Sequence, residues 1–354
     1  MRPTFHPLPV SRVDRLCEDA VAITFDVPPE LADLYAFRAG QYLTVRQVVD
    51  QAEERRSYSI CAPPSAAPRI GVRRVEGGLF SSMLVDSLRP GDVLEVLPPL
   101  GNFSPALDAG SEHHAFIAAG SGITPVLSIA TAVLESNEDS QVTLLYGNRR
   151  TDTVMFAEDL ADLKDRYNAR LQLVHVLSRE PRDVELFSGR LDADRMRALL
   201  DTLVPVSDVD HWWLCGPYGM LQDADMALAA FDVPSSRIHR ELFYVKEPPP
   251  EPKRIDESGV DGPTAAVTIV LDSRETTLTL PAETPILDAA QRVRADLPFA
   301  CKGGVCGTCR AKVTDGQVEM RRNYALEDHE VAAGFVLTCQ SLPLSDKVTV
   351  DYDA

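Results

Sequence analysis

The chain has 354 residues, of which 45% are hydrophobic and 25% are charged, and its formal net charge is −18. This length exceeds one ordinary hydrophobic core and predicts two or three domains of globular composition. Nucleic acids and anionic membranes attract clusters of basic residues, so the acidic balance argues against both classes of partner.

The N-terminal segment carries no apolar run of the kind that a signal peptide needs. Cysteines that are to serve as thiolates also suit a reducing compartment. We therefore expect a cytoplasmic protein, and we expect the isolated chain to be a monomer.

The first part of the chain, residues 1–110, contains short β-rich runs separated by turns. Examples are residues 21–25, 41–45 and 92–96, with Gly and Pro between them. Strands at this spacing predict an antiparallel barrel.

Two motifs in this part offer the groups that a flavin needs. Arg56-Ser57-Tyr58-Ser59 provides a cation for phosphate, a flat ring, and a hydroxyl for the N5 edge of the isoalloxazine. Alone, it could equally be an ordinary edge strand. The run from Gly77 to Ser82 places small residues before a predicted helix, an arrangement that receives a pyrophosphate. The candidate flavin residues are Arg56, Ser57, Tyr58, Ser59, Gly77, Gly78, Phe80, Ser81 and Ser82.

From about residue 112, apolar strands alternate with helical patterns. This rhythm predicts an open parallel sheet with helices on both faces over residues 111–245. The uncharged run 115–134 is as long as a membrane span, but Gly120-Ser121-Gly122 and Pro125 interrupt it. Strand, turn and helix explain that run better. The expected strands are 115–119, 142–146, 171–177 and 211–215, and the expected helices include 156–167 and 193–203.

Two turns in this sheet are candidates for binding a nicotinamide dinucleotide. Gly120-Ser121-Gly122-Ile123-Thr124-Pro125 joins a strand to a helix, so its backbone can approach a phosphate closely. Pro125 replaces the third glycine of the G-x-G-x-x-G fingerprint, and a plain tight turn is the alternative. Cys215-Gly216-Pro217 ends a later strand at the edge where open sheets bind ligands. Cys215 lies beside the nicotinamide ring in one interpretation and is an inert thiol in the other.

Basic residues at two strand ends bear on the choice between NADPH and NADH. Arg149, Ser178 and Arg179 suit the 2′-phosphate of NADPH, whereas NADH sites usually place an acid against the ribose. Glu180 is adjacent and weakens this argument, but we favour NADPH. The candidate nucleotide residues are Gly120, Gly122, Thr124, Pro125, Arg149, Ser178, Arg179, Cys215, Gly216 and Pro217.

A proline-rich stretch at 246–264 predicts a linker that separates a last domain, 265–354. Within that domain, residues 267–271 and 275–280 predict a hairpin and 286–294 predict a helix.

Four cysteines in the last domain show the spacing C-x4-C-x2-C, followed after 29 residues by a fourth Cys. This is the plant-type ferredoxin signature for a [2Fe–2S] cluster, which carries one electron at a time. The alternatives are a zinc site, a disulfide framework and chance clustering, and we consider each of them less favoured than the cluster. The candidate cluster ligands are Cys301, Cys306, Cys309 and Cys339.

Taken in order, the motifs above and a distal Glu241-Leu242-Phe243 resemble the ferredoxin–NADP reductase superfamily over residues 1–245. The cysteine motif resembles plant-type ferredoxins over about 265–354. The segments 5–8, 55–61, 145–149, 238–243 and 323–327 are more closely similar to the family of phenylacetyl-CoA 1,2-epoxidase reductases. That family is similar to the reductases of steroid-ring hydroxylases and other multicomponent oxygenases.

The resemblance implies an FAD-binding barrel, an NADP-binding α/β domain and a β-grasp-like ferredoxin domain. Electrons would pass from NADPH through FAD and the cluster to an oxygenase component. FMN stays open as the flavin, and a steroid-ring or aromatic-ring hydroxylase stays open as the partner. Ser59, Cys215 and Glu241 are the residues that we expect around the hydride-transfer site.

Two other functions stay open from the residues alone. One is a stand-alone redox module with a vestigial nicotinamide domain. The other is a flavoenzyme that acts directly on a small organic substrate, with the cluster serving structure only.

Overall fold

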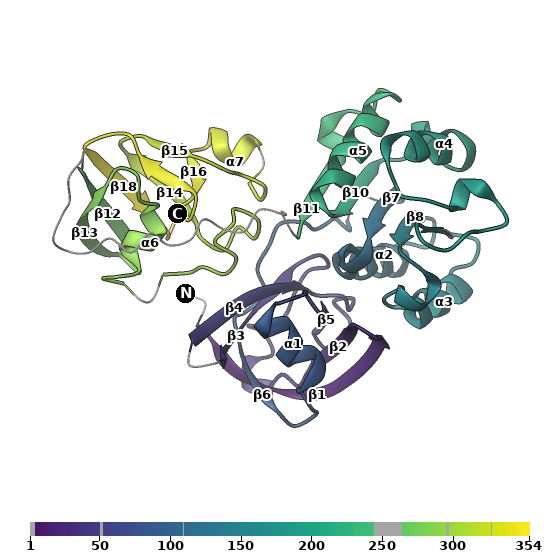
Figure 1. The fold of residues 1–354 in the computed structure, drawn as a ribbon, viewed down its shortest axis with the longest axis horizontal. Coiled ribbons are helices and arrows are strands. Elements are labelled where there is room, and N and C mark those ends of the chain that lie inside the picture. Colours follow the sequence, from purple (N-terminus) through teal and green to yellow (C-terminus); the bar gives the residue numbers. More distant parts are fainter. Residues whose placement is uncertain (1–3, 50–51, 109, 244–263, 295–296, 327) are drawn as a thin grey trace. The chain divides into compact units, whose positions relative to one another are not determined.

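The computed structural model describes residues 4–49, 52–108, 110–243, 264–294, 297–326 and 328–354 (Figure 1). One compact unit contains the described residues up to Phe243, and a second contains those from Thr264 onward. The linker predicted at 246–264 lies, up to residue 263, outside the described residues.

The first unit begins with an antiparallel six-stranded sheet in the order β4-β3-β6-β1-β2-β5. A bridge between Ile60 and Ile70 joins the chain after β4 to β5, the opposite edge strand. The predicted antiparallel barrel is therefore confirmed. Its elements are β1 (His6–Cys17), β2 (Ala20–Phe25), β3 (Tyr42–Val49), β4 (Ala52–Ser59), β5 (Arg69–Arg73), β6 (Val93–Val96) and the helices η1 (Pro29–Leu31) and α1 (Leu79–Asp86).

The barrel encloses its own apolar core, because alternate strand residues point inward. Ile23, Leu43 and Ile70 are fully buried there. Helix α1 adds Phe80 and Leu84 to the same core, which anchors the turn that precedes the helix.

The second half of this unit is a parallel five-stranded sheet in the order β11-β10-β7-β8-β9. Figure 1 shows α2 and α3 on one side of it and α4 and α5 on the other. The predicted open α/β sheet is confirmed. Its elements are β7 (His113–Ala119), η2 (Gly120–Gly122), α2 (Ile123–Ser136), β8 (Gln141–Asn148), η3 (Thr151–Thr153), α3 (Ala157–Arg166), β9 (Leu171–Leu177), η4 (Glu185–Phe187), α4 (Ala193–Leu203), η5 (Val206–Asp208), β10 (His211–Gly216), α5 (Tyr218–Ala229), η6 (Ser235–Arg237) and β11 (Ile238–Leu242).

The uncharged run 115–134 forms β7, the η2 turn and most of α2. Helix α2 is buried from Ile123 to Leu134, which explains why this run lacks charge. None of the described helices combines the length and apolarity needed to cross a bilayer.

The second unit is a mixed five-stranded sheet in the order β13-β12-β18-β14-β16, with a separate β15-β17 pair. Its central strand, β18, is parallel to β12 and antiparallel to β14. The elements are β12 (Thr264–Leu271), β13 (Arg274–Pro281), α6 (Ile286–Ala290), β14 (Arg310–Asp315), β15 (Val318–Met320), α7 (Asp328–Ala332), β16 (Phe335–Leu337), β17 (Ser341–Pro343) and β18 (Lys347–Asp351).

The helix predicted at 286–294 is shorter than expected and ends at Ala290. Beyond it the backbone changes to tighter bonds, from Arg292 N to Ala289 O and from Val293 N to Ala290 O. These i→i−3 bonds interrupt the regular helical ladder, although Arg294 N still donates to Ala290 O at 2.8 Å. The apolar pattern therefore overestimated the helix by about one turn.

Candidate redox sites

The barrel and the parallel sheet meet where Ser59 ends β4. Ser59 is 4% exposed, and its Oγ donates a hydrogen bond to Glu241 Oε2 at 3.1 Å. On the sheet, Cys215 of β10 pairs in register with Glu241 of β11. The structure thus brings together the three residues expected around hydride transfer, although 182 positions separate Ser59 from Glu241.

Burial sets the protonation of two of these groups. It raises the pKa of Glu241 to about 8, and the hydrogen bond from Ser59 offsets part of that rise. It also raises the pKa of Cys215, with the nearby Glu241 carboxylate adding to the effect. Cys215 has no exposed surface and belongs to the hydrophobic core, so it is a protonated, packed thiol.

Two aromatic side chains of the predicted flavin site lie parallel. The rings of Tyr58 on β4 and Phe80 on α1 are 6.4 Å apart with an interplanar angle of 14°. Burial raises the pKa of Tyr58, so its hydroxyl stays protonated. The residues present fit a flavin, which needs flat apolar partners.

The turn before α1 fits a phosphate. Gly77 has a φ of +73° and open space where a Cβ would stand. Gly78 is the N-cap of α1, and no side chain caps that helix, which leaves its first N–H groups available to an anion.

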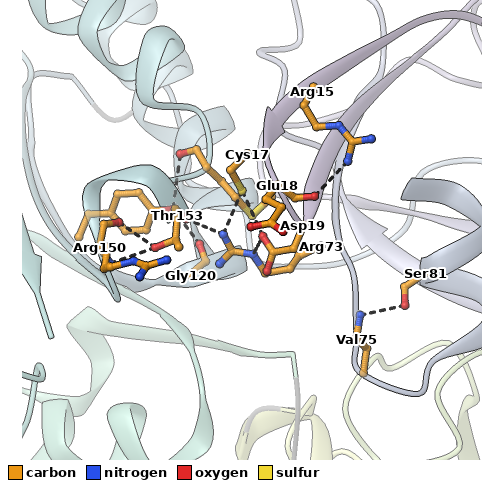
Figure 2. A network of polar contacts seen from close by, with 12 residues as sticks. Arg15, Cys17, Glu18, Asp19, Arg73, Val75, Ser81, Gly120, Arg150 and Thr153 are labelled. Atoms are coloured by element: carbon orange, nitrogen blue, oxygen red, sulfur yellow. Dashed lines mark hydrogen bonds and ion pairs between the residues drawn. The ribbon is translucent and has the colours of Figure 1, made fainter. Parts of the chain in front are cut away.

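Three predicted flavin residues have partners within the protein. Arg56 pairs with Glu54 at 2.7 Å. Ser57 shares a hydrogen bond with Thr44 at 3.0 Å. Ser81 Oγ accepts from Val75 N at 3.0 Å, as Figure 2 shows, so this hydroxyl holds the turn in shape.

The glycine turn after β7 packs directly on the end of β10. A Cβ on Gly122 would lie 2.1 Å from Cys215 O, so only glycine allows this approach. The two predicted nucleotide turns are therefore in contact. Thr124 is buried and donates to Ser121 O at 3.0 Å, which gives it a role in shaping the turn.

The sequence pattern does not single out Tyr146 as a site residue. Its hydroxyl donates to Gly120 O at 2.9 Å from the neighbouring strand β8. Tyr146 lies within an apolar strand pattern, so the sequence indicated only a core residue.

The loops after β8 and β9 are joined by their backbones. Arg179 N donates to Arg149 O at 2.8 Å, and Ser178 N donates to Asn148 O at 2.9 Å. Within the part of the chain that the structure describes, the guanidinium groups of Arg149 and Arg179 form no ion pair or hydrogen bond. The backbones of two arginines that have no counter-ion among the described residues are therefore hydrogen-bonded to each other.

The Glu180 carboxylate, which would favour NADH, is hydrogen-bonded within the protein. Its carboxylate accepts from Thr151 N at 2.8 Å and from Thr151 Oγ1 at 2.7 Å. These bonds hold the pKa of Glu180 below its usual value. They direct the acid to the start of η3, where Arg150 and Arg182 also act on its charge.

The four cysteines of the second unit meet as two pairs. Hydrogen bonding with Cys306 lowers the pKa of Cys301 to about 6, and Gly303 N and Val305 N also donate to its sulfur. Cys309 forms a hydrogen bond with Cys339, although the two are far apart in sequence.

The loop around these thiols is built for close approach. Gly304 and Gly307 have φ values of +79° and +69°. Thr338 N donates to Cys309 O at 3.2 Å, which brings the following cysteine to its partner. Among the described residues, no three metal-binding side chains are grouped to hold a single ion. Pairs of thiols match a two-iron cluster, which takes two thiolates on each iron.

Three family models match the chain. The "Oxidoreductase FAD-binding domain" matches residues 7–104 and the "Oxidoreductase NAD-binding domain" matches 116–226. The "2Fe-2S iron-sulfur cluster binding domain" matches 269–344. The FAD, NAD and 2Fe-2S modules are thus present.

Full-length relatives align with the chain from end to end. The chain is 45% identical to a component of the 1,2-phenylacetyl-CoA epoxidase of Escherichia coli (strain K12), covering 99% of this chain and 98% of the relative. It is 34% identical to the ferredoxin reductase component of 3-ketosteroid-9-alpha-monooxygenase from Rhodococcus rhodochrous, covering 98% and 96%. Phthalate dioxygenase reductase shares the fold with a TM-score of 0.61 at 23% identity, covering 98% of both chains.

Proposed function

This chain belongs to the family of flavin- and iron–sulfur-containing reductase components of multicomponent oxygenases, and from that premise we propose that it carries electrons from NADPH to an oxygenase of the phenylacetyl-CoA epoxidase type. When bound, the nicotinamide supplies a hydride, the flavin accepts the electron pair, and the cluster releases electrons one at a time. The contact between Ser59 and Glu241, where barrel and sheet meet, is the observation that carries the proposal.

The roles of the residues follow from their surroundings. Tyr58, which is only partly buried, gives the flavin an apolar partner, and Phe80 supports the Tyr58 ring from within the barrel core. Gly77 and Gly78 receive the phosphates of the flavin. Ser59 and Glu241 orient the reacting edge. Cys215 packs behind them as an uncharged thiol.

The nucleotide is held by the Gly120–Gly122 turn, with Arg149 and Arg179 at the 2′-phosphate. The cluster ligands are Cys301, Cys306, Cys309 and Cys339. We place the functional domains at 1–110, 111–245 and 265–354, and propose a cytoplasmic protein that is a monomer when isolated.

The partner is proposed from the relative that is 45% identical over nearly the whole chain. A steroid-ring hydroxylase is the second candidate, because a relative at 34% identity serves one. Reconstitution with each purified oxygenase decides between them: NADPH-dependent product should form with the epoxidase components. Product with the steroid hydroxylase alone would overturn the proposed partner. HPLC of the released flavin should show FAD and not FMN.

We expect Arg179→Ala to weaken binding of NADP⁺ about tenfold (~1.4 kcal/mol) and to leave NAD⁺ binding nearly unchanged. The reason is that Arg179 has no counter-ion among the described residues and is anchored beside Arg149. Isothermal titration calorimetry with NADP⁺ and with NAD⁺ measures the ratio of the two dissociation constants. The matched control is Arg197→Ala, which removes a guanidinium paired with Asp194 on α4. An equal loss for both nucleotides would contradict a 2′-phosphate role.

The raised pKa of Glu241 predicts how the stability of the folded protein changes with pH. Its pKa in the folded protein, about 8, exceeds its ordinary value of 4.5, so folding favours the protonated form. The stability from this group is complete below pH 4.5 and is lost as the pH rises toward and beyond 8. We expect Glu241→Gln, which cannot ionise, to gain stability relative to the wild type over this window.

Denaturant unfolding of both proteins between pH 5 and pH 9, roughly spanning that window, measures this difference. A gap that stays constant with pH would contradict a raised pKa. The same variant should lose any step near pH 8 in the rate of flavin reduction, which ties the carboxyl group to the reaction.

A further inference from the structure

One strand of the barrel carries an alternating pattern that its own core does not explain. In β5, Ile70 and Val72 point inward and are fully buried in the barrel core. Arg69, Gly71 and Arg73 alternate with them and point to the opposite face. Each of these three contacts the nucleotide-binding half of the unit.

Gly71 is at the centre of this contact. A Cβ there would lie 2.5 Å from Thr124 Cγ2 and 2.9 Å from two ring carbons of Phe156. Phe156 has a φ of +57°, a conformation that costs a bulky residue energy, and it caps α3. The barrel and the sheet therefore touch through a site with no room for one methyl group.

Arg69 lies on one flank of Gly71. Its Nη1 binds Asp159 Oδ1 of α3 at 2.5 Å, and its guanidinium lies 5.2 Å from the centre of the Phe156 ring. Arg69 and Asp159 also line a cavity of about 630 Å³ between the barrel and α2 and α3. The polar contacts of Arg69 therefore add to an apolar cluster that the two halves share.

Arg73 lies on the other flank and connects three segments, as Figure 2 shows. Its Nε binds Asp19 Oδ1 at 3.1 Å, in the turn between β1 and β2. Its Nη2 donates to Thr153 O at 2.5 Å, at the end of η3. Its Nη1 lies 3.3 Å from where a Cβ on Gly120 would be, so the same guanidinium borders the glycine turn.

We propose that Arg69, Gly71 and Arg73 form a joint that fixes the glycine turn of the nucleotide domain relative to the flavin barrel, and that Arg73 is its positioning residue. Hydride transfer requires the reacting atoms to lie about 3–3.5 Å apart, and a misplacement of about 1 Å can slow it about a hundredfold. Arg73 touches backbone on the nucleotide side, so it sets the place of that domain without contacting the reacting atoms. The kinetic part of this inference rests on the proposed function.

The test compares Arg73→Ala with Arg74→Ala in the cofactor-loaded protein. Arg74 is the adjacent arginine, and it pairs with Asp86 inside the barrel. For Arg73→Ala we expect flavin content to be unchanged and the rate of flavin reduction at saturating NADPH to fall about tenfold or more. The deuterium isotope effect with 4-deuterated NADPH should become more temperature-dependent, and NADP⁺ affinity should change little.

Hydrogen exchange provides the second readout, independent of turnover. Amides at 119–122 and 151–156 should exchange faster in Arg73→Ala than in Arg74→Ala. Arg73→Lys keeps the charge and one bond and should lie between the wild type and Arg73→Ala. If Arg73→Ala does not fold, Arg73→Lys carries the same comparison.

The proposed joint would be overturned if Arg73→Ala matched Arg74→Ala in its reduction rate, its isotope effect and its amide exchange. Lost NADP⁺ affinity with an unchanged rate at saturation would overturn it in favour of direct nucleotide binding. A wild-type protein that fails to oxidise NADPH would instead contradict the proposed function, and the exchange comparison would still decide on the joint.

Discussion

Replacing Cys306 with alanine is expected to abolish cytochrome c reduction while ferricyanide reduction continues near the wild-type rate. Cys306 forms one of the two thiol pairs, with Cys301, so its loss leaves one iron short of a ligand. The described residues up to Phe243 form a separate compact unit, and the flavin reaction should survive there. Ferricyanide takes electrons at the flavin, whereas cytochrome c needs the one-electron relay.

Stopped-flow and steady-state assays with both acceptors measure the split, and the visible spectrum reports the cluster. Cys306→Ser is the graded control, because an alkoxide oxygen can replace the thiolate weakly. Loss of both activities in Cys306→Ala would indicate general misfolding and would remove support for a relay.

Replacing Ser59 with alanine is expected to slow flavin reduction by NADPH about a hundredfold and to leave the cluster spectrum intact. Two effects combine at this position. The hydroxyl is lost from the expected reacting edge of the flavin, and Glu241 loses its hydrogen-bond donor. A partly buried carboxyl group without that partner has a still higher pKa.

Ser57→Ala is a matched control for this variant. Ser57 lies two positions earlier on the same strand, but its hydroxyl bonds to Thr44 within the barrel. Anaerobic stopped-flow at the flavin absorbance band compares the two. Reduction of Ser59→Ala at the rate of Ser57→Ala would exclude the proposed role of Ser59.

The elements that the sequence predicted best are those with dense apolar patterns. The bounds expected for β9 and α4 are those of the structure, because buried strands and amphipathic helices leave a strong local signal. The cysteine motif predicted the cluster ligands equally well, because cluster ligation requires a fixed spacing of cysteines.

Contacts between distant segments could not be read in this way. Ser57 and Ser81 matched a flavin motif, but both hydroxyls have partners within the protein. The hydrogen bond from Thr151 to Glu180 forms because the loops after β8 and β9 lie next to each other in the fold. No pattern in the sequence singles out Arg73, and only the fold shows that Thr153 and Gly120 lie beside it.

The order in which the strands are synthesised gives β18 a particular consequence. This strand comes last among those described, yet it is the middle of its sheet, between β12 and β14. Domains fold as units, N-terminal first, while the chain emerges from the ribosome. The flavin and nucleotide half can therefore reach its native state early, whereas the cysteine loop waits for β18 to complete the sheet beneath it. The iron–sulfur cluster would then be inserted late in biogenesis. A chain whose synthesis stopped before β18 would be a flavoprotein that lacks the cluster needed to pass electrons on.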